Sequence, residues 1–199
     1  MRHLLARERL LQARGIRPLR IVVGASGEAP QGWLVTEQDF LNLLDPTTWQ
    51  TFFDKPCVDA ILAEHVWEHL TLEEGRQAAR VCFDYLRPGG YARVAVPDGL
   101  HPDPAYRECV RPGGSGAGAD DHKVLYTHGL LSEVFESAGF TVSLLEYFDA
   151  SGTFHYVDWD PDDGLIVRSR RFDERNCDGH NHYTSIIIDA VKPGLTPRG

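Results

Sequence analysis

Short apolar runs alternate with longer segments of helical periodicity along the chain. Six runs rich in Val, Ile, Leu and aromatic residues have the length and composition of strands: 20–23, 33–37, 58–64, 91–98, 141–149 and 182–191. Apolar and capping patterns predict helices over three further segments: 45–53, 70–86 and 127–140. Strands that alternate with helices predict an α/β domain with a mainly parallel sheet, in which ligands bind beyond the carboxyl ends of the strands.

Residues that commonly begin or end helices lie at these boundaries. Thr71 and Glu74 have the spacing of a capping box at the start of the second helix. Pro46 suits the first turn of the preceding helix, and Gly139 suits the left-handed residue that ends a helix. Residues 1–17 predict a short amphipathic helix packed on the domain, because their leucines recur at rough helical spacing.

The composition limits the classes of protein. The chain has 199 residues, of which 42% are hydrophobic and 25% charged, and this is typical of one globular domain. Its net charge of −9 argues against an exposed nucleic-acid-binding surface. The four cysteines are widely spaced without a CxxC pair, which favours a reducing compartment over a disulfide framework. Charges interrupt the N-terminal segment too often for a signal peptide or a membrane span, so we expect a cytoplasmic protein.

Five segments, taken in order, carry a resemblance to a known family. They are "IVVGASG", "WLVTE", "DAILAEHVWEHL", "LRPGGYARVAVPD" and "LLSEVFESAGFTVSLLEYF". Together they resemble class I S-adenosylmethionine-dependent methyltransferases, and are closest to a group of bacterial predicted methyltransferases of unknown substrate. The resemblance implies a single domain over residues 1–199 with a Rossmann-like, mainly parallel seven-stranded sheet. It also implies helices on both faces, an antiparallel last strand and S-adenosylmethionine as the cofactor.

The resemblance further implies a cofactor site in the loops that follow the first three strands. A turn of small residues lets backbone N–H groups meet the methionine carboxylate, and an acidic side chain can accept hydrogen bonds from both ribose hydroxyls. The implied residues are Gly24, Ala25, Ser26 and Gly27 in the turn, Glu37 at the ribose, Asn42 and Leu43 at the adenine, and Glu64 near the methylsulfonium. The turn departs from the family's usual GxGxG pattern, because Val22 replaces an acidic residue and Ser26 and Glu28 replace glycines.

The segment "AEHVWEHL" places two Glu–His pairs where a strand leads into a helix. We expect the first pair, Glu64 and His65, to face the chemistry, and His65 is a candidate catalytic base because its unperturbed pKa is about 6.5. The second pair, Glu68 and His69, matches a common motif of the family that holds the turn by hydrogen bonds. His65 and His69 would share one face as metal ligands only within one helix, and His65 precedes the helix, so we expect no metal.

A loop rich in Gly, Pro and Asp, residues 98–127, follows the fourth strand on the ligand side of the sheet. Long loops in compact domains are commonly functional, and the family uses this region for its substrates. His101 is the second candidate catalytic base, and the candidate substrate-binding residues are Asp98, Asp103, Tyr106, His122 and Tyr126. A solvated loop held by internal turns is the alternative. A metal site among its His and Asp residues is disfavoured, because their spacing matches no ligand pattern.

Residues 150–182 predict a β-hairpin or a lid inserted before the last strand. "DPDDG" at 160–164 has the chemistry of a turn, and His155, Asp158, Trp159 and several arginines are concentrated nearby. The segment could cover the pocket or form a dimer contact. A charged surface hairpin with mutual ion pairs is the alternative.

These patterns favour an enzyme that transfers a methyl group from S-adenosylmethionine to an O, N or C nucleophile of a small molecule. Positioning does most of the work in such a transfer, because the cofactor carries a good leaving group. The alternative is a protein that binds the cofactor or a nucleoside without methyl transfer, in a regulatory or assembly role. We expect a small-molecule substrate and neither a nucleic-acid nor a membrane partner, and we leave a homodimer open.

Overall fold

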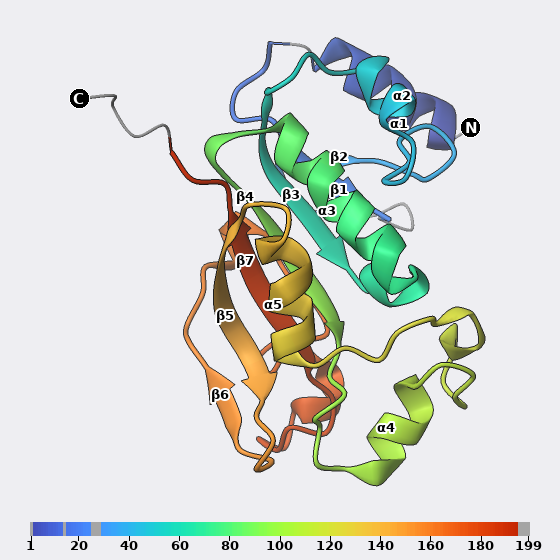
Figure 1. The fold of residues 1–199 in the computed structure, drawn as a ribbon, viewed down its shortest axis with the longest axis vertical. Coiled ribbons are helices and arrows are strands. Elements are labelled where there is room, and N and C mark those ends of the chain that lie inside the picture. The colour runs from blue at the N-terminus through green and yellow to red at the C-terminus, as the bar shows by residue number, and fades with distance from the viewer. Residues whose placement is uncertain (1, 14, 25–28, 195–199) are drawn as a thin grey trace.

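The computed structural model describes residues 2–13, 15–24 and 29–194, which form one seven-stranded sheet covered on both faces (Figure 1). The strands are β1 (Arg20–Val23), β2 (Leu34–Val35), β3 (Val58–Glu64), β4 (Leu86–Pro97), β5 (Thr141–Phe148), β6 (Phe154–Tyr156) and β7 (Ser185–Val191). Their order across the sheet is β2-β1-β3-β4-β7-β5-β6. β1 is parallel to β2 and β3, and β3 is parallel to β4, whereas β7 is antiparallel to both β4 and β5. The prediction of a Rossmann-like sheet with an antiparallel last strand is therefore confirmed.

Nine helical segments occur in the described part of the chain. The α-helices are α1 (Arg2–Gln12), α2 (Pro46–Gln50), α3 (Leu72–Tyr85), α4 (Pro104–Val110) and α5 (His128–Glu136). The 3-10 helices are η1 (Trp67–His69), η2 (Ala119–Asp121), η3 (Pro161–Asp163) and η4 (Glu174–Asn176). The capping box predicted at α3 is confirmed, since Thr71 Oγ1 accepts from the Glu74 N–H at 3.3 Å and Glu74 Oε2 accepts from the Thr71 N–H at 2.8 Å.

Alternate residues of the central strands face opposite sides of the sheet, which explains their continuous apolar sequence. In β1, Ile21 and Val23 belong to the core on the helix side, whereas Val22 belongs to the core on the other face. Ile61 and Leu62 of β3 divide in the same way. Helices α3 and α5 lie in front of the sheet in Figure 1, and their buried residues complete the core on the helix side.

The other face of the sheet is covered by residues 157–176, here called the covering segment, which contain η3 and η4. Trp159 and Ile166 of this segment belong to one apolar cluster with Leu62 of β3 and Ala95 of β4. One face of the sheet is thus covered by α-helices, and the other by a mostly extended segment with two short 3-10 helices.

Arg93 of β4 attaches the covering segment to the sheet and is only 3% exposed. Its Nε and Nη2 donate to the two carboxylate oxygens of Asp189 on β7, at 2.8 and 2.9 Å. Its Nη1 donates to the carbonyl oxygens of Asp160 and Gly164, at 2.9 and 3.0 Å. The guanidinium carbon also lies 5.1 Å from the ring centre of Trp159. One buried side chain therefore joins two strands and the segment that covers them.

Residues 150–182 begin in the turn of the hairpin formed by β5 and β6, which pair antiparallel. The turn of this hairpin is organised by Asp149, whose Oδ1 accepts from the N–H groups of Ser151 and Thr153 at 2.8 and 3.0 Å. The "DPDDG" stretch forms η3, capped by Asp160, and does not connect two strands. Across the described residues, no helix has both the length and the apolar character that a membrane crossing requires.

Candidate functional site

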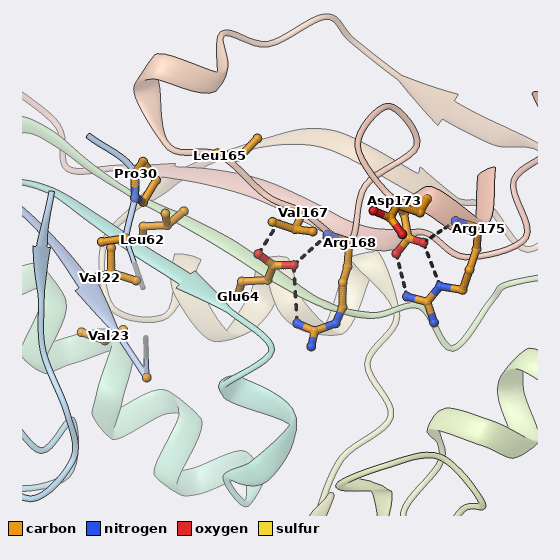
Figure 2. Close-up of a pocket in the computed structure, with 13 residues that line it drawn as sticks. Val22, Val23, Pro30, Leu62, Glu64, Leu165, Val167, Arg168, Asp173 and Arg175 are labelled. Atoms are coloured by element: carbon orange, nitrogen blue, oxygen red, sulfur yellow. Dashed lines mark hydrogen bonds and ion pairs between the residues drawn. The ribbon is translucent and has the colours of Figure 1, made fainter. Parts of the chain in front are cut away.

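A pocket of about 680 Å³ opens at the carboxyl ends of β1 and β3. The sheet side is formed by apolar residues of these strands, and the opposite wall is formed by the covering segment (Figure 2). The lining residues are Val22, Val23, Gly24, Ala29, Pro30, Leu62, Glu64, Leu165, Val167, Arg168, Asp173, Glu174 and Arg175. The pocket thus lies at the sheet edge where ligands of parallel α/β proteins bind.

Gly24 follows β1 directly and has a φ of +65°, in the left-handed region. A Cβ atom at this position would lie 2.6 Å from Cγ2 of Val66, so any side chain would collide with the turn after β3. The two strand ends therefore approach closely only because residue 24 is glycine. The other predicted members of this turn, Ala25, Ser26 and Gly27, lie outside the described residues.

Glu64 ends β3 and lines the pocket, but its carboxylate is already engaged by the covering segment. It accepts hydrogen bonds from the backbone N–H groups of Val167 and Arg168 at 3.1 and 2.7 Å. The guanidinium of Arg168 lies 3.5 Å from the same carboxylate, as Figure 2 shows. In this state Glu64 holds the opposite wall of the pocket in place.

Glu37 and Asn42 line a second, more open depression of about 630 Å³ beyond the end of β2. Because β2 pairs with β1, this depression lies at the same edge of the sheet as Gly24, although no described residue lines both hollows. Asn42 Oδ1 accepts from the Leu44 N–H at 2.8 Å, and Leu43 is buried in the helix-side core. The structure thus separates the predicted ribose and adenine residues from the first pocket.

His101 has both ring nitrogens engaged and is 2% exposed. Nδ1 accepts from the Asp103 N–H at 3.2 Å, and Nε2 donates to the carbonyl oxygen of Asn181 at 3.0 Å. Its ring stacks on Tyr106 at 4.0 Å between centres, and burial lowers its pKa. A neutral imidazole with no free nitrogen has nothing with which to accept a substrate proton.

Two further residues of the 98–127 loop, Asp98 and Tyr106, also form internal contacts. Asp98 is fully buried, and its oxygens accept from the N–H groups of Leu100 and Phe148 at 2.9 and 2.7 Å. The Tyr106 hydroxyl donates to the carbonyl of Thr184 at 2.7 Å and accepts from the Asp98 N–H at 3.0 Å. These side chains join the loop to β5 and to the start of β7, and they do not line the pocket.

Asp103 serves as the N-cap of α4, where its Oδ1 accepts from the Ala105 N–H at 2.8 Å. This helix lies within the segment that the sequence analysis describes as a loop. With only seven residues, α4 is too short for apolar periodicity to reveal it. The Asp-Pro pair that begins it was visible in the sequence as a possible helix start.

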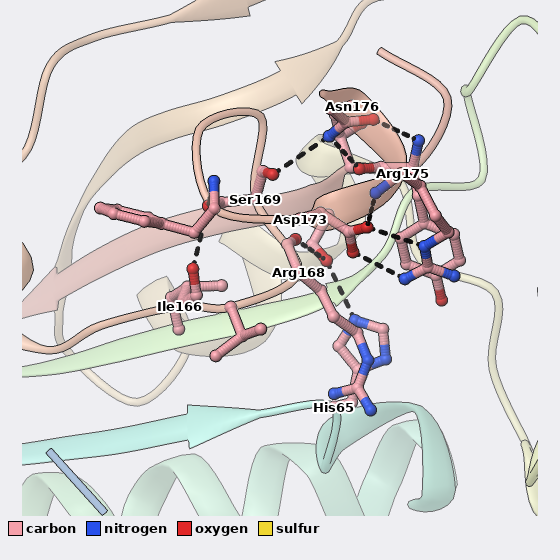
Figure 3. Close-up of polar contacts among 12 residues, drawn as sticks. His65, Ile166, Arg168, Ser169, Asp173, Arg175 and Asn176 are labelled. Atoms are coloured by element: carbon pink, nitrogen blue, oxygen red, sulfur yellow. Dashed lines mark hydrogen bonds and ion pairs between the residues drawn. The ribbon is translucent and has the colours of Figure 1, made fainter. Parts of the chain in front are cut away.

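His65 follows β3 with an unusual φ of +55° for a residue other than glycine, and its side chain is 11% exposed. Its Nε2 lies 3.0 Å from Ser185 Oγ, whose own proton is directed to the carbonyl of Arg168 at 2.7 Å. Nε2 therefore donates, and Nδ1 is the accepting nitrogen. Burial, followed by the charge of Arg168, lowers the pKa of His65 well below its usual value. His65 is neutral and points toward the covering segment (Figure 3).

The remaining predicted residues gather beyond His65, away from the first pocket. Glu68 Oε1 lies 3.2 Å from His65 Nδ1, and the rings of His69 and His122 meet at 4.8 Å between centres. Tyr126 is buried, and the charge of Glu68 contributes to the rise in its pKa, after burial. The prediction that His69 holds the turn by a hydrogen bond is confirmed, since its Nδ1 lies 3.2 Å from Oδ2 of Asp121. The same prediction is confirmed for Glu68 through its backbone carbonyl, which accepts from the N–H groups of Lys123 and Val124 at 2.7 and 3.3 Å. Its carboxylate has no hydrogen-bond partner among the described residues.

No protein-family model matches the sequence, and no curated protein matches it. Solved structures match the fold over nearly the whole chain. A "SAM-dependent methyltransferase, possible histamine N-methyltransferase" from Thermotoga maritima aligns with a TM-score of 0.51 at 13% identity, over 96% of this chain and 91% of that one. The fold is that of a class I S-adenosylmethionine-dependent methyltransferase.

Two other methyltransferase structures show the same fold. The "CurJ carbon methyltransferase" aligns with a TM-score of 0.51 at 15% identity, over 98% of this chain and 54% of that one. An "O-methyltransferase family protein" from Burkholderia thailandensis aligns with a TM-score of 0.50 at 10% identity, over 96% of this chain and 56% of that one. The three names specify N, C and O acceptors, so the methyltransferase fold alone does not distinguish the nucleophile.

The residues through which the covering segment lines the first pocket were not predicted from the sequence. Asp173 and Arg175 form a bidentate pair at 2.7 and 2.6 Å (Figure 3). The guanidinium carbon of Arg175 lies 3.3 Å from the ring centre of Tyr183. Asn176 donates to the carbonyls of Ser169 and Tyr183, at 3.2 and 2.7 Å. These contacts shape an irregular segment without helical or strand periodicity. The sequence signal was limited to a cluster of arginines and aspartates after the 160–164 turn.

Proposed function

We propose that the chain binds S-adenosylmethionine and transfers its methyl group to an O, N or C nucleophile of a small molecule. The observation that carries this proposal is the pocket at the ends of β1 and β3, beside the glycine turn, in a methyltransferase fold. Its volume of about 680 Å³ lies within the roughly 300–1,000 Å³ of small-molecule sites.

The residues at this pocket fit such a cofactor. Val22 and Leu62 offer apolar surface, and the closely packed Gly24 turn lets the backbone approach a ligand. Arg168 has a side chain 45% exposed at the pocket and would pair with the methionine carboxylate. Glu37 is half-buried and lines the neighbouring depression at the same edge of the sheet. It would accept hydrogen bonds from the ribose hydroxyls of a cofactor that extends from the first pocket into this depression.

The bound cofactor supplies an activated methyl group with a good leaving group, and the protein orients the nucleophile and excludes water. Of the two histidines proposed as a base, His101 has both nitrogens in hydrogen bonds. His65 keeps an accepting Nδ1 beside Glu68, so it is the better candidate to receive a substrate proton.

The alternative, a binding protein that transfers no methyl group, is favoured by one observation. The carboxylate of Glu64, which the family resemblance places near the methylsulfonium, is occupied by Val167 and Arg168 of the same chain. A ligand that contacts Glu64 must share the carboxylate with these contacts, whereas a smaller nucleoside could bind beside them.

Calorimetric titration with S-adenosylmethionine and S-adenosylhomocysteine tests the proposal. Glu37→Ala should weaken binding by about 1–3 kcal/mol, or about 5- to 150-fold, because it removes the ribose hydrogen bonds. Glu136→Ala, at an exposed acidic position of α5, is the control and should bind like the wild type.

Release of S-adenosylhomocysteine in the presence of small-molecule acceptors then separates the two functions. Cofactor binding with turnover supports the methyltransferase, and binding without turnover across an acceptor panel supports the binding protein. Absence of binding of either compound by the wild type overturns the proposed methyl transfer, and of the alternative leaves only a protein that binds a smaller nucleoside.

A further inference from the structure

We propose that Glu68, His69 and His122 form a binding site for a divalent transition metal, best suited to Zn²⁺. The proposal concerns metal binding and does not depend on the proposed methyl transfer. It rests on the convergence of three ligand side chains, the tautomer of both imidazoles, and a buried carboxylate that lacks a hydrogen-bond partner among the described residues.

The three ligands come from two segments that the fold brings together. Glu68 and His69 belong to η1, between β3 and α3, and His122 directly follows η2. One ligand atom from each residue can be chosen so that all three lie within 4.8 Å of one another. In a tetrahedral zinc site with bonds of about 2.0–2.1 Å, ligand atoms are about 3.3 Å apart. Movements of about 1 Å would close the site.

Both imidazoles are held in a tautomer that leaves one ring nitrogen able to bind a metal. His69 Nδ1 lies 3.2 Å from Oδ2 of Asp121, and His122 Nδ1 lies 2.7 Å from the carbonyl oxygen of Val110. Both partners are acceptors, so each Nδ1 carries the proton and each Nε2 keeps its lone pair. A histidine that ligates a metal commonly donates its other N–H to a carboxylate or a carbonyl in this way.

Glu68 supplies an independent observation. It is 1% exposed, and neither of its carboxylate oxygens has a hydrogen-bond partner among the described residues. His65 Nδ1 lies 3.2 Å from Oε1, but this contact lacks hydrogen-bond geometry. The hydroxyl of Tyr126, in the same region, is also buried without a partner. A buried carboxylate without a partner is costly, and a cation bound between Glu68 and the two imidazoles would remove that cost.

The donor set indicates the class of metal. Two imidazole nitrogens and one carboxylate oxygen suit Zn²⁺, Fe²⁺ or Co²⁺, whereas Mg²⁺ and Ca²⁺ prefer oxygen ligands. Three protein ligands leave one position of a tetrahedral zinc ion open. The competing explanation is a metal-free site in which Glu68 is protonated and shares its proton with His65; burial raises the pKa of Glu68 to about 8.

Titration of the chelator-treated protein with Zn²⁺, in competition with a chromophoric chelator, distinguishes the metal site from this explanation. We expect one Zn²⁺ per chain. Zn²⁺ binding should weaken by at least ~100-fold in each of three variants, His69→Ala, His122→Ala and Glu68→Gln. Loss of a residue that only hydrogen-bonds to a ligand typically weakens metal binding by ~10–100-fold, so a larger loss indicates a direct ligand. His155→Ala is the control, because His155 pairs with Asp149 on the β5–β6 hairpin; its affinity should stay within about 2-fold of wild type.

The visible absorption of bound Co²⁺ gives a direct view of the ligands, and the spectrum should change on removal of either imidazole. Zn²⁺ should also raise the melting temperature of the wild type but not of the ligand variants. If His122→Ala does not fold, His69→Ala decides, because the His69 side chain is already 33% exposed. Failure of the wild type to bind Zn²⁺ overturns the proposal. The proposal is also overturned if His69→Ala binds Zn²⁺ as tightly as the wild type. It is equally overturned if Zn²⁺ binding is lost in His182→Ala, at the exposed His180–His182 pair.

Discussion

Arg93→Met should destabilise the protein strongly, because the buried Arg93 of β4 links Asp189 of β7 to two carbonyl groups of the covering segment. The substitution removes two charge-assisted hydrogen bonds to Asp189 and two bonds to the carbonyls of Asp160 and Gly164. Removing one partner of a buried ion pair costs about 3–5 kcal/mol. The side chain of Asp189 is 21% exposed and regains some water, so we expect about 3 kcal/mol.

Thermal and urea unfolding measure this effect. For a chain of this size, 1 kcal/mol corresponds to about 2–4 °C, so the melting temperature of Arg93→Met should fall by about 6–12 °C. Arg80→Met is the matched control, because Arg80 pairs with Glu73 at the surface; it should cost under about 0.5 kcal/mol.

A double variant separates the ion pair from the contacts to the covering segment. Arg93→Met combined with Asp189→Leu should recover part of the loss, because no unpaired carboxylate remains at the sheet. A loss below about 1 kcal/mol in the single variant would show that Arg93 does not attach the segment, and the reasoning would be refuted.

Three further predictions concern single side chains. Thr71→Ala should lower the free energy of unfolding by about 1 kcal/mol because the N-cap of α3 is lost, whereas Thr71→Ser should keep the cap and the wild-type stability. Equal urea midpoints for the wild type and both variants would exclude a stabilising cap. Gly24→Ala should lower the melting temperature because the added methyl group meets Val66; an unchanged melting temperature would show that the turn can shift. Hydrogen bonds from Ser151 and, to a smaller extent, His155 lower the pKa of Asp149 in the folded protein. The ionised carboxylate therefore stabilises the fold above the unfolded pKa of about 4, and this stabilisation is lost as the pH falls from there through the folded pKa. Asp149→Asn should therefore be less stable than the wild type at pH 6, by a difference that narrows towards pH 3 in urea unfolding; a constant difference would contradict this.

The sequence predicted the sheet well wherever burial on both faces produced a continuous apolar run. The third predicted strand, residues 58–64, coincides with β3, and the capping box placed the start of α3 within two residues. By contrast, β2 is reduced to two residues. The sequence did not predict β6 as a separate strand, because three residues at a sheet edge are too few to show a hydrophobic period.

The candidate site was predictable only in part, for a related reason. Strand ends can be read from local sequence, which is why Gly24 and Glu64 were placed at the correct edge of the sheet. The opposite wall of the pocket, including Arg168 and Asp173, belongs to an irregular segment fixed by long-range contacts. The cluster around Glu68 likewise depends on His122, which lies 53 positions beyond His69 in the sequence and meets it only through the fold.

The covering segment is at once part of the hydrophobic core and a wall of the pocket, so its local opening and ligand binding are thermodynamically linked. A ligand held against Leu165 and Arg168 would stabilise the closed state by RT ln(1 + [L]/Kd), about 2.7 kcal/mol at 100 times the Kd. Backbone amides that exchange through this opening, those of Val167 and Arg168 among them, would then exchange up to about 100-fold more slowly. Their hydrogen exchange would report a ligand of this pocket before its chemistry is known.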